Sequence, residues 1–260
     1  TAQKTGVHGI FNAAFDMSPD RANIGEGSLF NEEIIQRTIP QLVAANLPLV
    51  HNEDEPGKTL DLYPSAEDGG GRSWAEKLLR APLYAALAQV PSVPAQDGKL
   101  YTPQQLNLPL SPKALREPEN ETLLQSFYEE VQKHPDIHSS WVHASAATNS
   151  TRHRILTEIF SLANNKVSSI REMLSTFAQK DSIDMTISAI KFSHTINHNG
   201  TADQIAEMRN TKFLWDGYKN IRPPKVSELS ITNSLENIEG NHGQYIHPDL
   251  CNNKECSVLL

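Results

Sequence analysis

The most informative segment of the chain is ANIGEGSLFNEEIIQRTIPQLVAANLPLVHNEDE, residues 22–55. It begins with a short apolar step that ends in the glycine-rich turn GEGS, residues 25–28. Asn31 fits the N-cap of a helix, because the two glutamates after it would lie at the positive end of the helix dipole. Pro40 interrupts the helical spacing, and residues 47–50 favour a short strand. We therefore predict a βαβ unit over this segment, with its two strands parallel.

Three other segments are predicted as strands. Residues 5–15 alternate in part, and residues 137–147 place a short apolar centre between polar flanks. Residues 183–192 alternate apolar and polar side chains more regularly. Because helical patterns separate these segments, we predict an α/β fold with a mostly parallel β-sheet core flanked by helices. An α+β fold with a smaller sheet is the alternative.

The length of the chain is compatible with a single α/β domain over residues 1–260. Six prolines between residues 91 and 118 predict an irregular Pro-rich excursion on the surface of this domain. Residues 219–260 are predicted as a loop-rich C-terminal tail. Its two cysteines, Cys251 and Cys256, have no second pair of ligands with which to form a structural zinc site.

The composition argues against several classes of protein. The 260 residues include 23 Lys and Arg against 31 Asp and Glu, which gives a net charge of −8. Nucleic-acid binding and electrostatic membrane anchoring both need a basic surface, so we expect neither. The longest apolar runs are far shorter than the ~20 residues that a membrane-spanning helix requires. With only two cysteines, the chain is not a disulfide-built secreted scaffold.

Polar side chains that can carry chemistry follow the predicted strands. Glu26 lies in the turn after the first strand, and His51 and Glu53 follow the second. His143 and His194 lie at the ends of two later strands. Because parallel strands end at one edge of a sheet, we expect these five side chains to converge. Paired carboxylates provide an acid and a base at neutral pH, a histidine can transfer protons, and the same groups can hold a divalent metal.

Each candidate also has a purely structural interpretation. Glycines around Glu26 are typical of a strand-to-helix turn. His143 could be a buried core histidine, and His194 could form a loop pair with His198 that has no role. Arg152 is expected on the surface, where it could pair with a substrate anion. Only the joint placement at successive strand ends favours a site.

The order strand, Gly-Glu-Gly-Ser, helix, strand and second glutamate resembles the erythromycin-esterase-like/ChaN-like superfamily. That group includes Tiki-type metalloproteases and Ras/Rap-cleaving toxin domains. The resemblance implies that Glu26 and Glu53 are acid/base or orienting carboxylates and that His143 is the general base. His51 or His194 would assist, and water would be the nucleophile, since no serine elbow or catalytic cysteine is recognisable.

One position departs from the family pattern, because Ser28 and Leu29 replace the histidine that the family carries just after its first glutamate. This departure favours an alternative, a non-catalytic interaction protein on a degenerate enzyme scaffold. A metal-dependent hydrolase is a further alternative. In the first two cases no cofactor is expected, and in the third a divalent metal is.

Within this superfamily the chain resembles the Hop class of type III secreted effectors of plant-pathogenic bacteria. The resemblance implies secretion by the bacterium and activity in the host cell cytoplasm. It also implies plant cell death through a direct or indirect link to a small TIR-domain immune receptor. The implied partner is a host plant protein or a small-molecule substrate, and the implied reaction is hydrolysis of an ester, amide or peptide bond.

Overall fold

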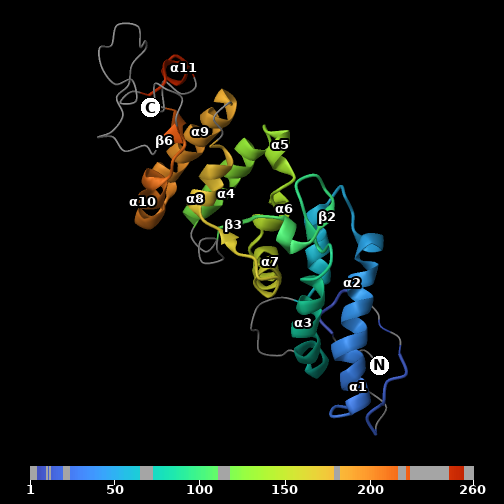
Figure 1. Ribbon diagram of the computed structural model, residues 1–260. Coiled ribbons are helices and arrows are strands. Elements are labelled where there is room, and N and C mark those ends of the chain that lie inside the picture. Colours follow the sequence, from blue (N-terminus) through green and yellow to red (C-terminus); the bar gives the residue numbers. More distant parts are fainter. Residues whose placement is uncertain are drawn as a thin grey trace. The chain divides into compact units, whose positions relative to one another are not determined.

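The structure is a computed structural model that describes residues 5–9, 11, 13–19, 24–64, 73–110, 118–178, 182–215, 221–222 and 246–254. Its elements are mostly helices with a few short strands (Figure 1). By their internal contacts they form two compact units, where we expected one domain. The first unit contains residues 1–108 and 139–167, and the second contains residues 109–138 and 168–260.

Helix α3 (Trp74–Leu87) is central to the first unit. It packs against α2 (Ile39–Val50) and α7 (Ser150–Leu162), and its Leu79 and Leu83 are fully buried. The other elements of this unit are α1 (Leu29–Glu33), the π-helix η1 (Ile34–Thr38), the 3-10 helices η2 (Pro56–Leu62) and η3 (Pro103–Gln105), strands β1 (Val93–Pro94) and β2 (Leu100–Tyr101), and α6 (Ala144–Ala147).

Helix α9 (Ile183–Asn199) is central to the second unit. It packs against α4 (Pro118–Val131), and the rings of Phe127, Phe177 and Phe192 meet beside this contact. The other elements are α5 (Pro135–His138), α8 (Ile170–Thr176), α10 (Ala202–Asn210), strands β5 (Leu214–Trp215) and β6 (Ile221–Arg222), and α11 (Pro248–Cys251). Strand β3 (Leu108–Pro109) pairs with β4 (Val167–Ser168).

The βαβ unit predicted for residues 22–55 is not formed. Residues 47–50, expected as a strand, are the last turn of α2, and the chain is helical without interruption from Leu29 to Val50. The helix passes Pro40 because the preceding turn is π-helical, which relieves the clash between a proline ring and the carbonyl four residues earlier. Pro48 is accommodated inside the last turn.

The strand predicted for residues 183–192 is also helical, as part of α9. Ser182 caps this helix by accepting a hydrogen bond from the backbone amide of Met185. Residues 185–190 are all buried, because α9 contacts α4, α8, α10 and α11. Over residues 185–190 the helix is buried on every side and has no polar face, so the short apolar alternation of this part resembled that of a strand.

No parallel-sheet core occurs among the described residues, so that part of the fold prediction is wrong. The chain instead combines helices with two-stranded sheets, of which β1–β2 and β5–β6 are antiparallel. Of the strand predicted for residues 137–147, only Trp141 and Val142 make isolated bridges. The described residues of 5–15 form no strand.

Two further segments differ from the sequence predictions. The Pro-rich segment 91–118 is not a surface excursion throughout, because residues 92–96 are buried and form part of the β1–β2 hairpin. In the tail, Cys251 is buried in α11, whereas Cys256 lies outside the described residues. Within the described part of the chain, no helix is both long and apolar enough to cross a membrane.

Candidate functional site

The two predicted catalytic glutamates do not meet. Glu26 precedes the helical run Leu29–Val50, and Glu53 follows it. At 1.5 Å per residue, a run of this length separates its two ends by about 30 Å. Both carboxylates are exposed. An acid/base pair of these two residues is therefore not assembled.

The glycine-rich turn around Glu26 is built by Asn31. This residue, predicted as an N-cap, is fully buried, and its side chain bonds the backbone of Asp16 and the Gly25 carbonyl. Ser28 is the N-cap in its place and accepts a hydrogen bond from the Asn31 amide. Gly27 has a φ of +79°, which favours glycine. The turn therefore has the structural role that glycines around a helix start predict.

His51 ties the end of α2 to the β1–β2 turn. Its Nε2 lies 2.6 Å from the Gly98 carbonyl oxygen, and its Nδ1 lies 2.6 Å from Thr59 Oγ1. A carbonyl only accepts, so Nε2 donates and Nδ1 accepts from the hydroxyl. With both ring nitrogens bonded, His51 serves to hold this loop.

His143 lies at the start of α6 and caps it. Its Nδ1 accepts from the Ser145 amide at 3.2 Å and lies 2.8 Å from Ser145 Oγ. The His143 amide donates to the Pro94 carbonyl of β1. The ring thus satisfies the N-terminus of a helix.

Arg152, predicted as a substrate-pairing residue, instead joins α7 to η2. Its Nε and Nη2 donate to the two carboxylate oxygens of Asp61 at 2.7 and 2.6 Å, and its Nη1 donates to the Ser145 carbonyl at 2.9 Å. This hydrogen-bonded guanidinium lowers the pKa of the Asp61 carboxyl. Gly57 is required here, since a Cβ would lie 2.4 Å from Ser145 Oγ.

His194 belongs to the second unit, on the exposed side of α9. Its partner is His198, one helical turn later, with 3.0 Å between the two Nε2 atoms. The pair that the sequence placed in a loop therefore lies on a helix. It lines a cavity between α4 and α9 together with Glu129.

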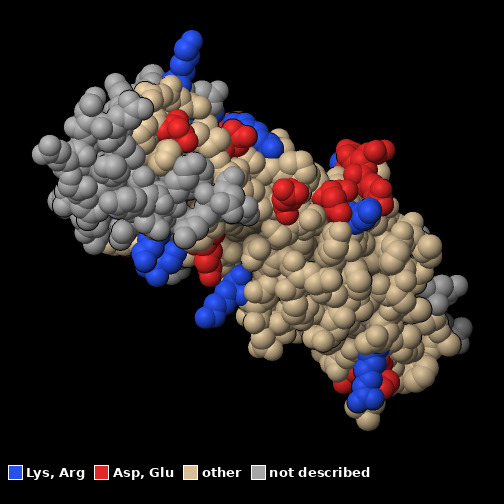
Figure 2. All heavy atoms as spheres, turned by 45° about the horizontal axis from the view of Figure 1, so that its top comes forward, with Lys and Arg blue, Asp and Glu red and all other residues tan. Residues whose placement is uncertain are grey.

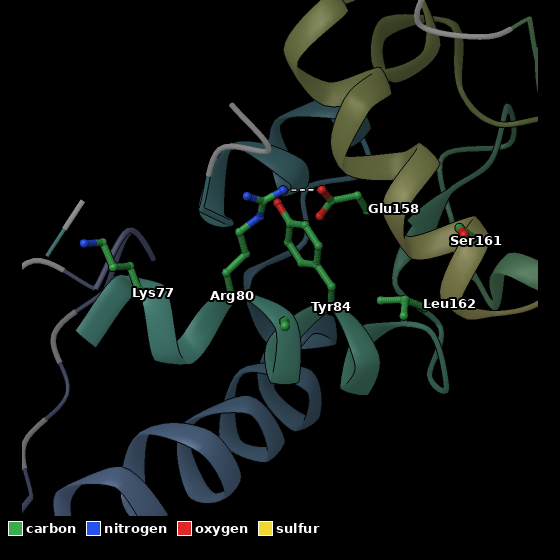
Figure 3. Close-up of a pocket in the computed structure, with 7 residues that line it drawn as sticks. Lys77, Arg80, Tyr84, Glu158, Ser161 and Leu162 are labelled. Atoms are coloured by element: carbon green, nitrogen blue, oxygen red, sulfur yellow. Dashed lines mark hydrogen bonds and ion pairs between the residues drawn. The ribbon is translucent and has the colours of Figure 1, made fainter. Parts of the chain in front are cut away.

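A pocket that the sequence analysis missed lies between α3 and α7 in the first unit (Figure 3). It has a volume of about 480 Å³. Arg80 and Glu158 form an ion pair across it, and Arg80 lies 5.8 Å from the centre of the Tyr84 ring. The residues that line it are Lys77, Arg80, Ala81, Tyr84, Glu158, Ser161 and Leu162.

The charges in this pocket limit what it can bind. Glu158 neutralises Arg80, whereas Lys77 at the rim is exposed and forms no ion pair with another described residue. The pocket therefore suits a small anionic group beside the apolar Ala81 and Leu162. The spacing of Lys77, Arg80 and Tyr84 on one helical face is the sequence pattern that could have revealed it.

The outer face of α2 is apolar and exposed. Leu42, Leu49 and Val50 have 50%, 81% and 56% of their surface exposed, whereas Leu47 points into the core. No charged residue occurs between Thr38 and Val50. Figure 2 accordingly shows a broad face of the first unit that carries no charged side chain.

Neither metal clusters nor relatives define the site further. Among the described residues, no group of three or more His, Cys, Asp or Glu side chains is arranged to hold a metal ion. No protein-family model, curated protein or solved structure matches the chain.

Proposed function

We propose that this chain is a bacterial effector that acts in the host plant cytoplasm by binding a host protein through the outer face of α2. The sequence resemblance to Hop-class effectors supports the cellular setting. The exposed Leu42, Leu49 and Val50 support the mode of action. Host cell death would follow through a direct or indirect link to a TIR-domain immune receptor.

The exposed apolar face is the observation that carries this proposal. Of the seven large apolar side chains that are exposed in the described structure, five lie between residues 29 and 50. Leu42 and Leu49 are seven residues apart and therefore share one side of the helix. Burying each such side chain contributes about 1.5–3 kcal/mol before the costs of association. Concentrated apolar surface of this kind is typical of a binding face.

The chemistry of this face favours one kind of partner. The segment from Thr38 to Val50 is uncharged, within a chain whose net charge is −8. A charged partner surface would lose water here without gaining an ion pair. We therefore expect the host protein to present an apolar groove that receives one side of a helix.

The dispersed glutamates favour binding over hydrolysis. Glu26 and Glu53 lie at opposite ends of the helical run, and His143 caps α6. A hydrolytic mechanism that needs these three groups at one bond has no support from their positions. Loss of the histidine after Glu26 agrees with the same interpretation.

Transient expression in plant leaves tests the proposal, with cell death measured as ion leakage. We expect the wild-type protein to cause cell death and the double variant Leu42→Asp/Leu49→Asp to lose at least nine-tenths of the leakage. Gln41→Asp places a single aspartate at another exposed position of α2 and should keep full activity. Protein levels by immunoblotting and circular dichroism of purified variants verify accumulation and folding.

The glutamate variants separate the two modes of action. Glu26→Ala and Glu53→Ala should each cause as much leakage as the wild-type chain. Loss of leakage in either variant would favour the hydrolase and overturn the binding proposal. Undiminished leakage from the double leucine variant would also overturn it, and an inactive wild-type chain would remove the effector assignment.

A further inference from the structure

His194 and His198 form a close pair on the solvent side of α9. They are one helical turn apart, so both rings project from the same side of the helix. Their Nε2 atoms are 3.0 Å apart, and the ring centroids are 4.3 Å apart. Because a nitrogen–nitrogen hydrogen bond needs one acceptor, one ring presents an unprotonated Nε2 to the other.

This separation matches the spacing of two nitrogens on one metal ion. At metal–nitrogen distances of about 2.0–2.1 Å, two ligands lie about 2.9 Å apart at a right angle and about 3.4 Å apart at a tetrahedral angle. The Nε2–Nε2 distance of 3.0 Å lies between these values. A metal ion placed to one side of the line that joins the two nitrogens can therefore lie within bonding distance of both, once each ring turns its Nε2 toward the ion.

The surroundings of the pair also suit a hydrated cation. The adjoining cavity measures about 510 Å³ and is lined by polar side chains from α4 and α9. Glu129 on α4 is the carboxylate among them, and it accepts a hydrogen bond from Gln125. Ser126 and Thr195 bond to each other across the two helices at 2.9 Å, which fixes the wall beside His194.

We propose that His194 and His198 chelate one divalent transition-metal ion on the surface of α9. Imidazole suits Zn²⁺, Ni²⁺ and Cu²⁺, whereas Mg²⁺ and Ca²⁺ prefer oxygen ligands. Water molecules complete the coordination, since both rings are exposed and no third side chain of the described structure joins them. The site lies in the second unit and does not depend on the proposed binding face of α2.

Isothermal titration of the full chain, without an added histidine tag, tests the site with NiCl₂, ZnCl₂ and CuCl₂. We expect Cu²⁺ to bind most tightly. His194→Ala and His198→Ala should each weaken this binding at least tenfold. The double variant should bind no more weakly than either single variant, because a chelate requires both rings. His8→Ala removes another exposed histidine and should leave the affinity unchanged.

Electron paramagnetic resonance of the Cu²⁺-loaded protein gives an independent readout. The wild-type spectrum should contain hyperfine coupling from two imidazole nitrogens, and neither single variant should retain the two-nitrogen pattern. Circular dichroism verifies that the histidine variants are folded. Equal affinity in wild-type and His194→Ala proteins, or a two-nitrogen spectrum in that variant, would overturn the proposal.

Discussion

At the scale of single residues, His51 and His143, which were predicted as catalytic groups, make hydrogen bonds that stabilise the fold. His143 caps a four-residue helix, where its ring Nδ1 accepts the amide of the residue two positions later. His51 bonds a carbonyl 47 positions away along the chain. The composition of the candidate site was therefore visible in the sequence, but the partners of each ring depend on backbone geometry that residue types do not specify.

The ion pair of Asp61 and Arg152 predicts a pH-dependent contribution to stability. Because the folded state lowers the pKa of Asp61, the pair stabilises the protein above the unfolded-state value of 3.8. This contribution disappears as the pH falls through the lowered folded value. Asp61→Asn should reduce the free energy of unfolding by about 1 kcal/mol at pH 7, a size typical of a half-exposed pair with bidentate geometry.

Urea unfolding at a series of pH values from 7 to 3 measures this difference between Asp61→Asn and wild type. We expect the two free energies of unfolding to converge below pH 3.8. Asp54→Asn removes another exposed carboxylate, which forms no ion pair within the described part of the chain, and it should behave as wild type throughout. A difference between Asp61→Asn and wild type that stays constant over the whole range would contradict the assignment.

At the scale of elements, the sequence predicted helices well when one side was polar. Ser73 before an apolar helical pattern predicts a helix, and so does the polar segment 148–151 before another; the structure contains both as α3 and α7. Thr201 followed three residues later by Gln204 predicts a capping box, and α10 begins with one. The predictions failed for the last turn of α2, which contains Pro48, and for the first part of α9, where residues 185–190 are all buried. In both cases tertiary packing outweighs local preference.

Replacing Pro48 should change the stability of α2. This proline is exposed and lies inside the last turn, where it removes one backbone hydrogen bond. Pro48→Ala restores that donor, partly offset by the greater freedom of the unfolded chain. We expect the free energy of unfolding to rise by about 1 kcal/mol. Thermal unfolding followed by circular dichroism measures it, and a lower melting temperature would show that the proline is needed for the helix end.

At the scale of the whole molecule, the sequence predicted the presence of helices and strands in one chain, but neither their layers nor the division into two units. The predicted convergence of Glu26, Glu53 and His143 required a parallel sheet. Because the described residues form no such sheet, nothing brings these three side chains together. Strand order and domain division depend on contacts between distant residues, such as those of α4 with α9. Local periodicity carries no information on such contacts.

Because the two units have separate cores, a core substitution in one unit should increase local unfolding mainly in that unit. Leu83 in the first unit and Phe192 in the second are both fully buried. Leu83→Ala and Phe192→Ala should each cost about 2–5 kcal/mol of stability. Hydrogen exchange followed by mass spectrometry should show faster exchange mainly in the unit that carries the substitution. Equal acceleration in both units by either variant would indicate one cooperative structure.

The interleaved order of the two units has a consequence during protein synthesis. Helix α4 leaves the ribosome well before α9, the helix against which it packs. At about 5–20 residues per second, the intervening chain takes roughly 3–10 s to translate. For that time Leu123, Leu124 and Phe127, all fully buried in the finished protein, have no partner helix. The nascent chain therefore exposes an apolar helix face for several seconds, and we expect chaperones to bind it during that time.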